Sequence, residues 1–85
     1  PPFTVGFAAE TQDVAHYAQD KLKRKKLDMI AANDVSQAGL GFNSEKNALN
    51  VYWNNGEKNL GVADKSQLAL TLMTLVAQRY AQKTT

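Results

Sequence analysis

Two short apolar runs with one helical pattern between them constrain the fold of this 85-residue chain more than any other feature. The first run, Phe3–Ala8, has apolar side chains on both strand faces, which is typical of a strand covered on both sides. The second run, Leu27–Ala32, stops at Asn33 and Asp34. Two strands joined by one helix form a parallel crossover unit, which is almost always right-handed. We therefore predict a strand–helix–strand unit over Val5–Ser36.

The helix of this unit is predicted to begin near Thr11 and to end at about Lys25. Thr11 is a suitable N-cap residue, and Asp13 places a negative charge in the first turn, where the helix dipole favours it. Residues three or four positions apart share one helix face, and along one such face lie Val14, Tyr17, Ala18, Lys21 and Lys25. The face that packs on the sheet therefore becomes basic over its last turn.

A β-hairpin is predicted further along the chain. Ala48–Trp53 alternates apolar and polar side chains, and an Asn-Gly pair follows at Asn55 and Gly56. Asn-Gly between alternating segments is the strongest short hairpin signal. With these two residues in the turn, Val51 faces Leu60, and the apolar sides of the two strands match.

A long loop, Asn33–Asn47, connects the crossover unit to the hairpin, and loops of this length usually carry function or move. After the hairpin, Asp64 with Gln67 three residues on predicts the start of a final helix. The predicted order is strand, helix, strand, loop, hairpin and helix, so the fold class is α/β. The first parallel pair still needs a neighbouring strand on its open side.

The composition excludes several kinds of protein. Ten basic and eight acidic residues give a net charge of +2, which argues against a dedicated nucleic-acid-binding protein. The absence of cysteine excludes disulfides and thiolate metal sites, and a single histidine, His16, argues against a histidine zinc site. No apolar run approaches the ~20 residues that span a bilayer. We expect a cytoplasmic protein without a membrane or nucleic-acid partner and without metal ligands in this chain.

Ligands of parallel crossover units collect at the carboxyl ends of the strands. Lys21 and Lys25 lie one helical turn apart, with about 6 Å between their Cβ atoms, so their ammonium groups could straddle a triphosphate. There they would stabilise its charge and that of a pyrophosphate leaving group. The alternative is a solvated basic helix end that complements the dipole. The other basic residues of this cluster, Lys23, Arg24 and Lys26, are expected to point elsewhere into solvent.

Phe7 lies near the carboxyl end of the first strand, after Gly6, which permits the close approach of a ligand. Its ring could pack on a base or ribose, or it could simply belong to the core. Asn33 and Asp34 end the second strand at the same edge. Asp34 could bind a metal or accept a hydrogen bond from a substrate, and the alternative is a turn that terminates the strand. No Ser/His/Asp arrangement, metal-ligand spacing or glycine-rich phosphate loop is visible, so we expect no nucleophilic catalysis from this chain.

Four segments of the chain resemble the C-terminal part of bacterial phosphopantothenate–cysteine ligases: VGFAAET, KLKRKKLDMIAANDVS, GFNSEKNAL and DKSQLAL. In many bacteria that ligase is the second domain of a bifunctional coenzyme A biosynthesis protein, fused to phosphopantothenoylcysteine decarboxylase. The resemblance implies a Rossmann-like fragment, β-α-β-loop-β-hairpin-α, of a larger three-layer sheet domain. It also implies a ligase that uses CTP and Mg²⁺. Phosphopantothenate attacks the α-phosphorus of CTP to give an acyl-cytidylate, and cysteine then displaces CMP to form the amide.

By position, the resemblance assigns the nucleotide contact to Phe7 and the triphosphate to Lys21 and Lys25. Asn33 and Asp34 match a strand-end pair with a weaker role beside the substrate or a dimer interface. The family's ligase domain is more than twice this length, and its glycine-rich first turn, its Ala-Asp-Trp segment and its upstream lysine flap have no counterpart here. We therefore expect residues 1–85 to be the C-terminal segment of a ligase domain, inactive alone, with the catalytic residues upstream. The implied partners are CTP, 4'-phosphopantothenate, cysteine, the rest of the ligase domain and a second copy of the full-length protein.

Two other readings of the sequence remain open. A small basic module could grip RNA or DNA phosphates through Lys21–Lys26, although the exposed aromatic residues that stack on bases do not accompany this cluster. A structural interaction domain is suggested by the broad apolar face of the last helix. The start at Pro1 instead of a Met indicates a piece of a longer protein, and a trimmed complete domain is the alternative.

Overall fold

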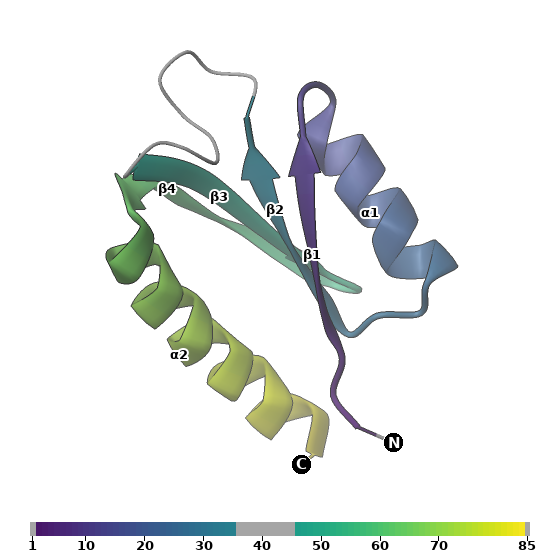
Figure 1. Cartoon of the computed structure of the whole chain (residues 1–85). Helices are drawn as coiled ribbons and strands as arrows, with labels where there is room; N and C mark the ends of the chain where they lie inside the picture. Colours follow the sequence, from purple (N-terminus) through teal and green to yellow (C-terminus); the bar gives the residue numbers. More distant parts are fainter. Residues whose placement is uncertain (1, 36–45, 85) are drawn as a thin grey trace.

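The computed structural model describes residues 2–35 and 46–84. Within these residues the chain forms four strands and two helices, coloured along the sequence in Figure 1. In chain order they are β1 (Val5–Glu10), α1 (Val14–Arg24), β2 (Met29–Asp34), β3 (Lys46–Trp53), β4 (Gly56–Asp64) and α2 (Lys65–Thr84). The predicted α/β class and the predicted element order are therefore confirmed. Of the predicted loop, residues 36–45 lie outside the described residues, and its two ends belong to β2 and β3.

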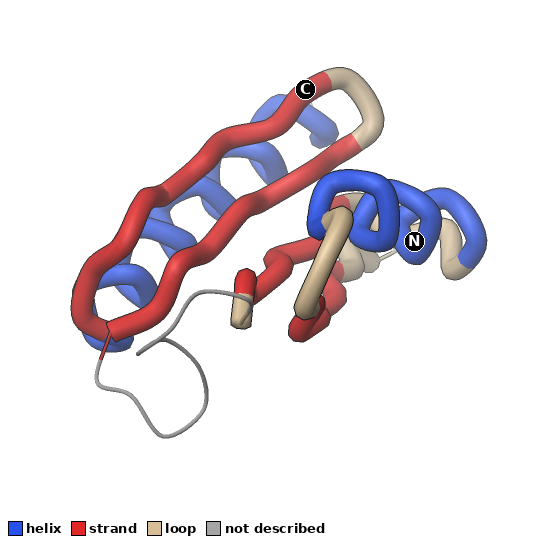
Figure 2. The backbone as a smooth tube through the Cα atoms, turned by 90° about the horizontal axis from the view of Figure 1, so that it is seen from above, coloured by secondary structure: helices blue, strands red, loops and turns tan. Residues whose placement is uncertain are grey.

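The strands form one sheet in the order β1-β2-β3-β4. β1 and β2 are parallel, as predicted for the crossover unit, and β3 is antiparallel to both of its neighbours. The sheet lies between two helices, with α1 over one face of β1–β3 and α2 along the opposite face of β3 and β4 (Figures 1 and 2). The described residues thus form a three-layer unit.

β2 is the centre of the core, because its first four residues are buried on both faces. Alternate side chains of a strand point to opposite faces. Ile30 accordingly packs on the α1 side with Leu22, whereas Met29 packs on the α2 side with Leu72 and Leu75. The sheet therefore carries one hydrophobic cluster under each helix.

β1 differs from the prediction that both of its faces are covered. Its α1 side packs on the core through Ala8, but on the other face Phe7 is 73% exposed and Ala9 is exposed as well. The reason is the position of α2, which runs beneath β3 and β4 and leaves the outer part of β1 open.

The ends of α1 follow from backbone conformation more than from side-chain caps. The N-cap is Asp13, not Thr11, and its φ of 47° lies in the left-handed region, which Asp tolerates better than most residues. At the other end, Lys26 also has a positive φ of 53°. The Lys26 N–H donates to the carbonyl of Lys23, and the Leu27 N–H donates to that of Leu22. These two bonds form a Schellman motif, which ends the helix and turns the chain into β2.

The hairpin turn lies one residue earlier than predicted, which shifts the pairing of the two strands by two residues. Trp53 pairs with Gly56, so the two turn residues are Asn54 and Asn55, and Val51 faces Lys58 instead of Leu60. A β-carbon on Gly56 would lie 2.8 Å from the indole nitrogen of Trp53, so the indole occupies the space above a residue without a side chain. The sequence prediction was wrong because it placed Gly56 in the turn, whereas Gly56 lies in β4 opposite Trp53 and leaves room for the indole ring.

A β-bulge further up the hairpin shifts the pairing again. The register slips between Leu49 and Asn50, so that Leu49 pairs with Gly61 and Ala48 with Val62. Gly61 has a φ of 76°, which glycine adopts without strain. β4 then runs to Asp64, and α2 begins at the next residue, as predicted.

Candidate functional site

The carboxyl ends of β1 and β2 lie side by side at one end of the sheet, which we call the rim. Glu10 pairs with Asp34 there, and Ala9 pairs with Asn33. The rim is the end at which the arrowheads of β1 and β2 point in Figure 1, and α1 begins beside it and runs back toward the other end. The crossover therefore brings both strand ends and the start of one helix to a single edge, as the sequence predicted.

Lys21 reaches this edge from α1. Its Nζ donates to Glu10 Oε1 at 2.7 Å, and the two side chains are 32% and 14% exposed. Side chains on a helix lean toward its N-terminus, so a lysine in the second half of α1 extends back toward the rim. The sequence predicts that the Lys21 and Lys25 ammonium groups act together at the strand ends, and of this pair Lys21 lies there.

Lys25 does not share this placement. It is the exposed C-cap residue of α1, one helical turn further from the rim than Lys21. Among the residues that the structure describes, none forms an ion pair with it. The predicted pair of cations is therefore split: Lys21 is held at the rim by Glu10, and Lys25 projects into solvent near the helix end.

Phe7 lies on the opposite face of the sheet, on the side of α2. Its exposed ring borders a cavity of about 440 Å³. The lining residues are Phe7, Ala8, Ala9, Ala31, Asn33 and Leu49, so the walls are mainly apolar. Of the two readings of Phe7, a core side chain does not fit the described part of the chain, and an aromatic surface beside a cavity does.

Asn33 and Asp34 lie on opposite faces because they are neighbours in a strand. The Asn33 amide donates to Asn47 Oδ1 at 3.3 Å, while its own Oδ1 is buried without a hydrogen-bond partner among the described residues. Buried acceptors are nearly always satisfied in folded proteins, so this oxygen is suited to a donor from outside those residues. Asp34 lies on the α1 face of the sheet, as Tyr52 does. Burial raises the pKa of the Tyr52 hydroxyl above its ordinary value, and the negative charges of Glu57 and Asp34 raise it further.

The rim thus presents two kinds of surface on its two sides. Phe7 and Asn33 share the apolar cavity on the α2 side, and Lys21 and Glu10 form the ion pair on the α1 side. Sequence reasoning singled out Phe7, Lys21 and Asn33 but missed Glu10. The available signal was the position of Glu10 as the last residue of β1, at the rim toward which a lysine of the crossover helix extends.

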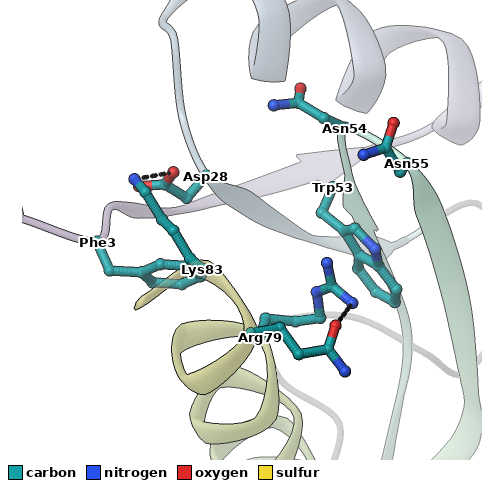
Figure 3. A pocket seen from close by; sticks show the side chains of 8 residues that line it. Phe3, Asp28, Trp53, Asn54, Asn55, Arg79 and Lys83 are labelled. Atoms are coloured by element: carbon teal, nitrogen blue, oxygen red, sulfur yellow. Dashed lines mark hydrogen bonds and ion pairs between the residues drawn. The ribbon is translucent and has the colours of Figure 1, made fainter. Parts of the chain in front are cut away.

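A second cavity, of about 380 Å³, lies at the other end of the sheet and was not predicted (Figure 3). Its lining residues are Phe3, Asp28, Trp53, Asn54, Asn55, Arg79, Gln82 and Lys83. Two cations of α2 border it, and each already has a contact. Lys83 forms an ion pair with Asp28, and the Arg79 guanidinium lies 4.8 Å from the centre of the Trp53 ring. These two contacts, Lys83–Asp28 and Arg79–Trp53, attach α2 to the strands, and we call them the clamp.

Comparison with known proteins identifies the family. Residues 1–80 match the model of the DNA/pantothenate metabolism flavoprotein C-terminal domain. The chain belongs to this family. One relative of the chain is the bifunctional coenzyme A biosynthesis protein CoaBC of Haemophilus influenzae. It is 58% identical over 83 residues, which cover 98% of the chain and 20% of that protein. CoaBC of Escherichia coli is 49% identical over 82 residues, covering 96% of the chain and 20% of that protein.

A solved structure of a CoaBC domain is also similar to this chain. The crystal structure of the C-terminal domain of CoaBC matches with a TM-score of 0.72 and 29% identity, over 92% of this chain and 35% of that one. The chain thus spans about a fifth of the length of the curated relatives and about a third of the solved domain. The resemblance to the C-terminal part of the bifunctional protein is confirmed. Neither of the helices in residues 2–35 and 46–84 combines the length and the apolar character that a membrane span requires.

Proposed function

We propose that this chain is the C-terminal segment of a cytoplasmic CTP-dependent ligase of coenzyme A biosynthesis. The ligase joins 4'-phosphopantothenate to cysteine through an acyl-cytidylate. The observation that supports this proposal most is the placement of the Lys21 ammonium beside Glu10 at the rim, where a parallel crossover unit receives its ligands. Membership of the flavoprotein C-terminal domain family and the similarity to CoaBC agree with it.

In this proposal the nucleotide lies across the rim. The cytosine or ribose packs on the exposed Phe7 ring in the apolar cavity, and the triphosphate extends toward Lys21. Lys21 stabilises the charge that develops as pyrophosphate departs, because a fixed cation lowers the energy of such a transition state. Lys25, exposed one helical turn further along, is proposed to reach the same triphosphate through its flexible side chain. The buried Oδ1 of Asn33 accepts a hydrogen bond from the nucleotide or the substrate, and Asp34, on the opposite face of the same strand end, contacts the substrate more weakly.

Magnesium belongs to the proposal as a companion of the triphosphate, since Mg²⁺ is usually held by substrate phosphates together with one or two carboxylates. Among residues 2–35 and 46–84, no three His, Cys, Asp or Glu side chains come close enough to hold a metal ion. We therefore assign no residue of this segment to the magnesium ion.

The segment is proposed to be inactive by itself. It spans about a third of the solved CoaBC C-terminal domain, so the residues that activate the carboxylate and bind cysteine are placed in the rest of the ligase domain. Within the described residues β1 is an edge strand that pairs only with β2, and its open edge is where that remainder would meet this segment. A second copy of the full-length protein is a further proposed partner.

The test uses a chimera in which this segment replaces the matching region of H. influenzae CoaBC, to which it is 58% identical. Lys21→Ala combined with Lys25→Ala should raise the apparent KM for CTP by at least tenfold, because each charge-assisted phosphate contact contributes about 1.5–3 kcal/mol. The matched control, Lys23→Ala combined with Lys26→Ala, removes the same charge from the same helix end and should change the KM little. Unchanged CTP kinetics in the first variant would refute the triphosphate role. Titrations of CTP and ATP on the unmodified chimera establish the nucleotide preference.

A further inference from the structure

We infer that Glu10 is a positioning residue, which holds the Lys21 ammonium at the rim so that it meets the nucleotide phosphates in the right place. The inference rests on the proposed function, since it assigns a role to Glu10 only through the phosphate contact of Lys21. It goes beyond that proposal because it names a carboxylate, of the same sign as the ligand, as part of the phosphate-binding arrangement.

Glu10 is the residue of the Glu10–Lys21 contact whose position is fixed by the sheet. Glu10 is the last residue of β1, where its backbone is held in the pairing with Asp34 and its carbonyl accepts the Val35 N–H at 3.0 Å. Its side chain is only 14% exposed. Lys21 has a long flexible stem, by contrast, and its ammonium group is the part that must be placed. The carboxylate therefore determines where the ammonium lies.

The arrangement leaves Lys21 able to bind phosphate. An ammonium group has three N–H donors, and the bond to Glu10 uses one of them, so two remain for phosphate oxygens. Protein kinases use the same device, in which a helix glutamate pairs with the lysine that contacts the ATP phosphates, and the pair must be in place for phosphoryl transfer. The pair at the rim has the same two residue types in the reverse placement, with the glutamate on β1 and the lysine on α1.

The other ion pair of α1 shows what a merely solvated contact looks like. Arg24 and Asp20 are 3.7 Å apart and their side chains are 62% and 57% exposed. Exposed pairs at this spacing contribute little and are screened by salt. Because this pair lies on the same helix and carries the same charges, Asp20 provides a matched control for Glu10.

A carboxylate near a triphosphate has two opposing effects, and these can be separated. Its charge repels the phosphates whether or not Lys21 is present, whereas its positioning effect requires Lys21. In the chimera, Glu10→Gln should raise the apparent KM for CTP about tenfold, the loss expected when one charge-assisted contact is misplaced. In the Lys21→Ala background the same substitution should give no further rise. Asp20→Asn should leave the KM unchanged in both backgrounds.

Glu10→Asp provides a second variant that keeps the charge and shortens the side chain by one methylene group. It should also raise the KM, because the shorter carboxylate holds the Lys21 ammonium away from its place at the rim while the repulsion stays. An unchanged KM in this variant overturns the inference even if Glu10→Gln does not fold.

The outcomes distinguish the inference from the proposed function. If Lys21→Ala leaves the KM for CTP unchanged, the proposed triphosphate role fails, and the role of Glu10 fails with it. If Lys21→Ala raises the KM but Glu10→Gln lowers it, or raises it equally in both backgrounds, only the positioning role of Glu10 is overturned. The proposed function then stands without it.

Discussion

The Lys83 ammonium donates to the Asp28 carboxylate, which joins the last turn of α2 to the start of β2 across 55 positions of the chain. Asp28 also accepts hydrogen bonds from the Thr4 backbone N–H and hydroxyl. One carboxylate thus connects the chain before β1, the start of β2 and the end of α2, and Figure 3 shows its contact with Lys83. Together with the stacking of Arg79 on Trp53, these contacts hold α2 against the sheet at the end opposite the rim.

The first prediction concerns the acid stability of this clamp. The hydrogen bond from Lys83, followed by that from the Thr4 backbone, holds the pKa of Asp28 below its ordinary value of 3.8. Its stabilising effect is therefore fully present above that value and is lost as the pH falls through the lower folded pKa. In the chimera, hydrogen–deuterium exchange of the last turns of α2 should accelerate in this acidic window. Asp28→Asn should exchange faster already at pH 7 and show a weaker acid dependence. Equal exchange in the two proteins at pH 7 would contradict the clamp.

The second prediction concerns Gly56, whose missing side chain makes room for the Trp53 indole. Gly56→Ala should destabilise the hairpin by about 1–3 kcal/mol, as overpacking does, and displace the ring. Trp53 is the single tryptophan of the segment, so in a chimera with no other tryptophan its fluorescence reports the displacement as a red shift. The control is Asn54→Ala, at an exposed turn position, which should leave the emission unchanged.

The third prediction uses the Schellman motif at the end of α1. Lys26→Gly should stabilise the fold by about 0.5–1 kcal/mol, because glycine adopts the positive φ of this position without steric cost. Lys23→Gly, inside the helix, should destabilise by a similar amount. Denaturant melts of the chimera and the two variants check the opposite signs, and a loss of stability in both would contradict the motif.

The fourth prediction separates function from stability at Phe7. Since its ring is 73% exposed, Phe7→Ala should change the free energy of unfolding little. It should nevertheless raise the apparent KM for CTP, because stacking on an aromatic ring contributes about 1–3 kcal/mol per base. Ile30→Ala, at a fully buried position of β2, should show the reverse pattern, with a loss of about 2–5 kcal/mol of stability. A large loss of stability in Phe7→Ala would identify Phe7 as a structural residue.

The sequence predicted the crossover unit because hydrophobic periodicity and chain direction determine it locally. The buried run of β2 and the apolar start of the α1 face were sufficient to place Phe7 and Asn33 at one edge. What failed were details that depend on contacts between distant residues. The predicted hairpin register was wrong because the Trp53 ring occupies the space above Gly56. The exposure of Phe7 was not predicted because it depends on the position of α2.

Glu10 was missed for a similar reason. Its contact depends on the length and lean of the Lys21 side chain, and spacing along a helix gives no measure of either. The clamp around Asp28 joins residues from both ends of the segment, which no local pattern reports. The nucleotide-handling roles of Phe7, Lys21, Lys25, Asn33 and Asp34 stay predictions until the chimera is measured.

The Glu10–Lys21 contact spans only 11 positions of the chain, and the Asp28–Lys83 contact spans 55. Closing a short loop costs less conformational entropy than closing a long one, so contacts of low sequence separation form sooner. During synthesis, the ion pair at the rim can assemble before β3, β4 and α2 have emerged from the ribosome. The attachment of α2 must wait until the whole segment has been made.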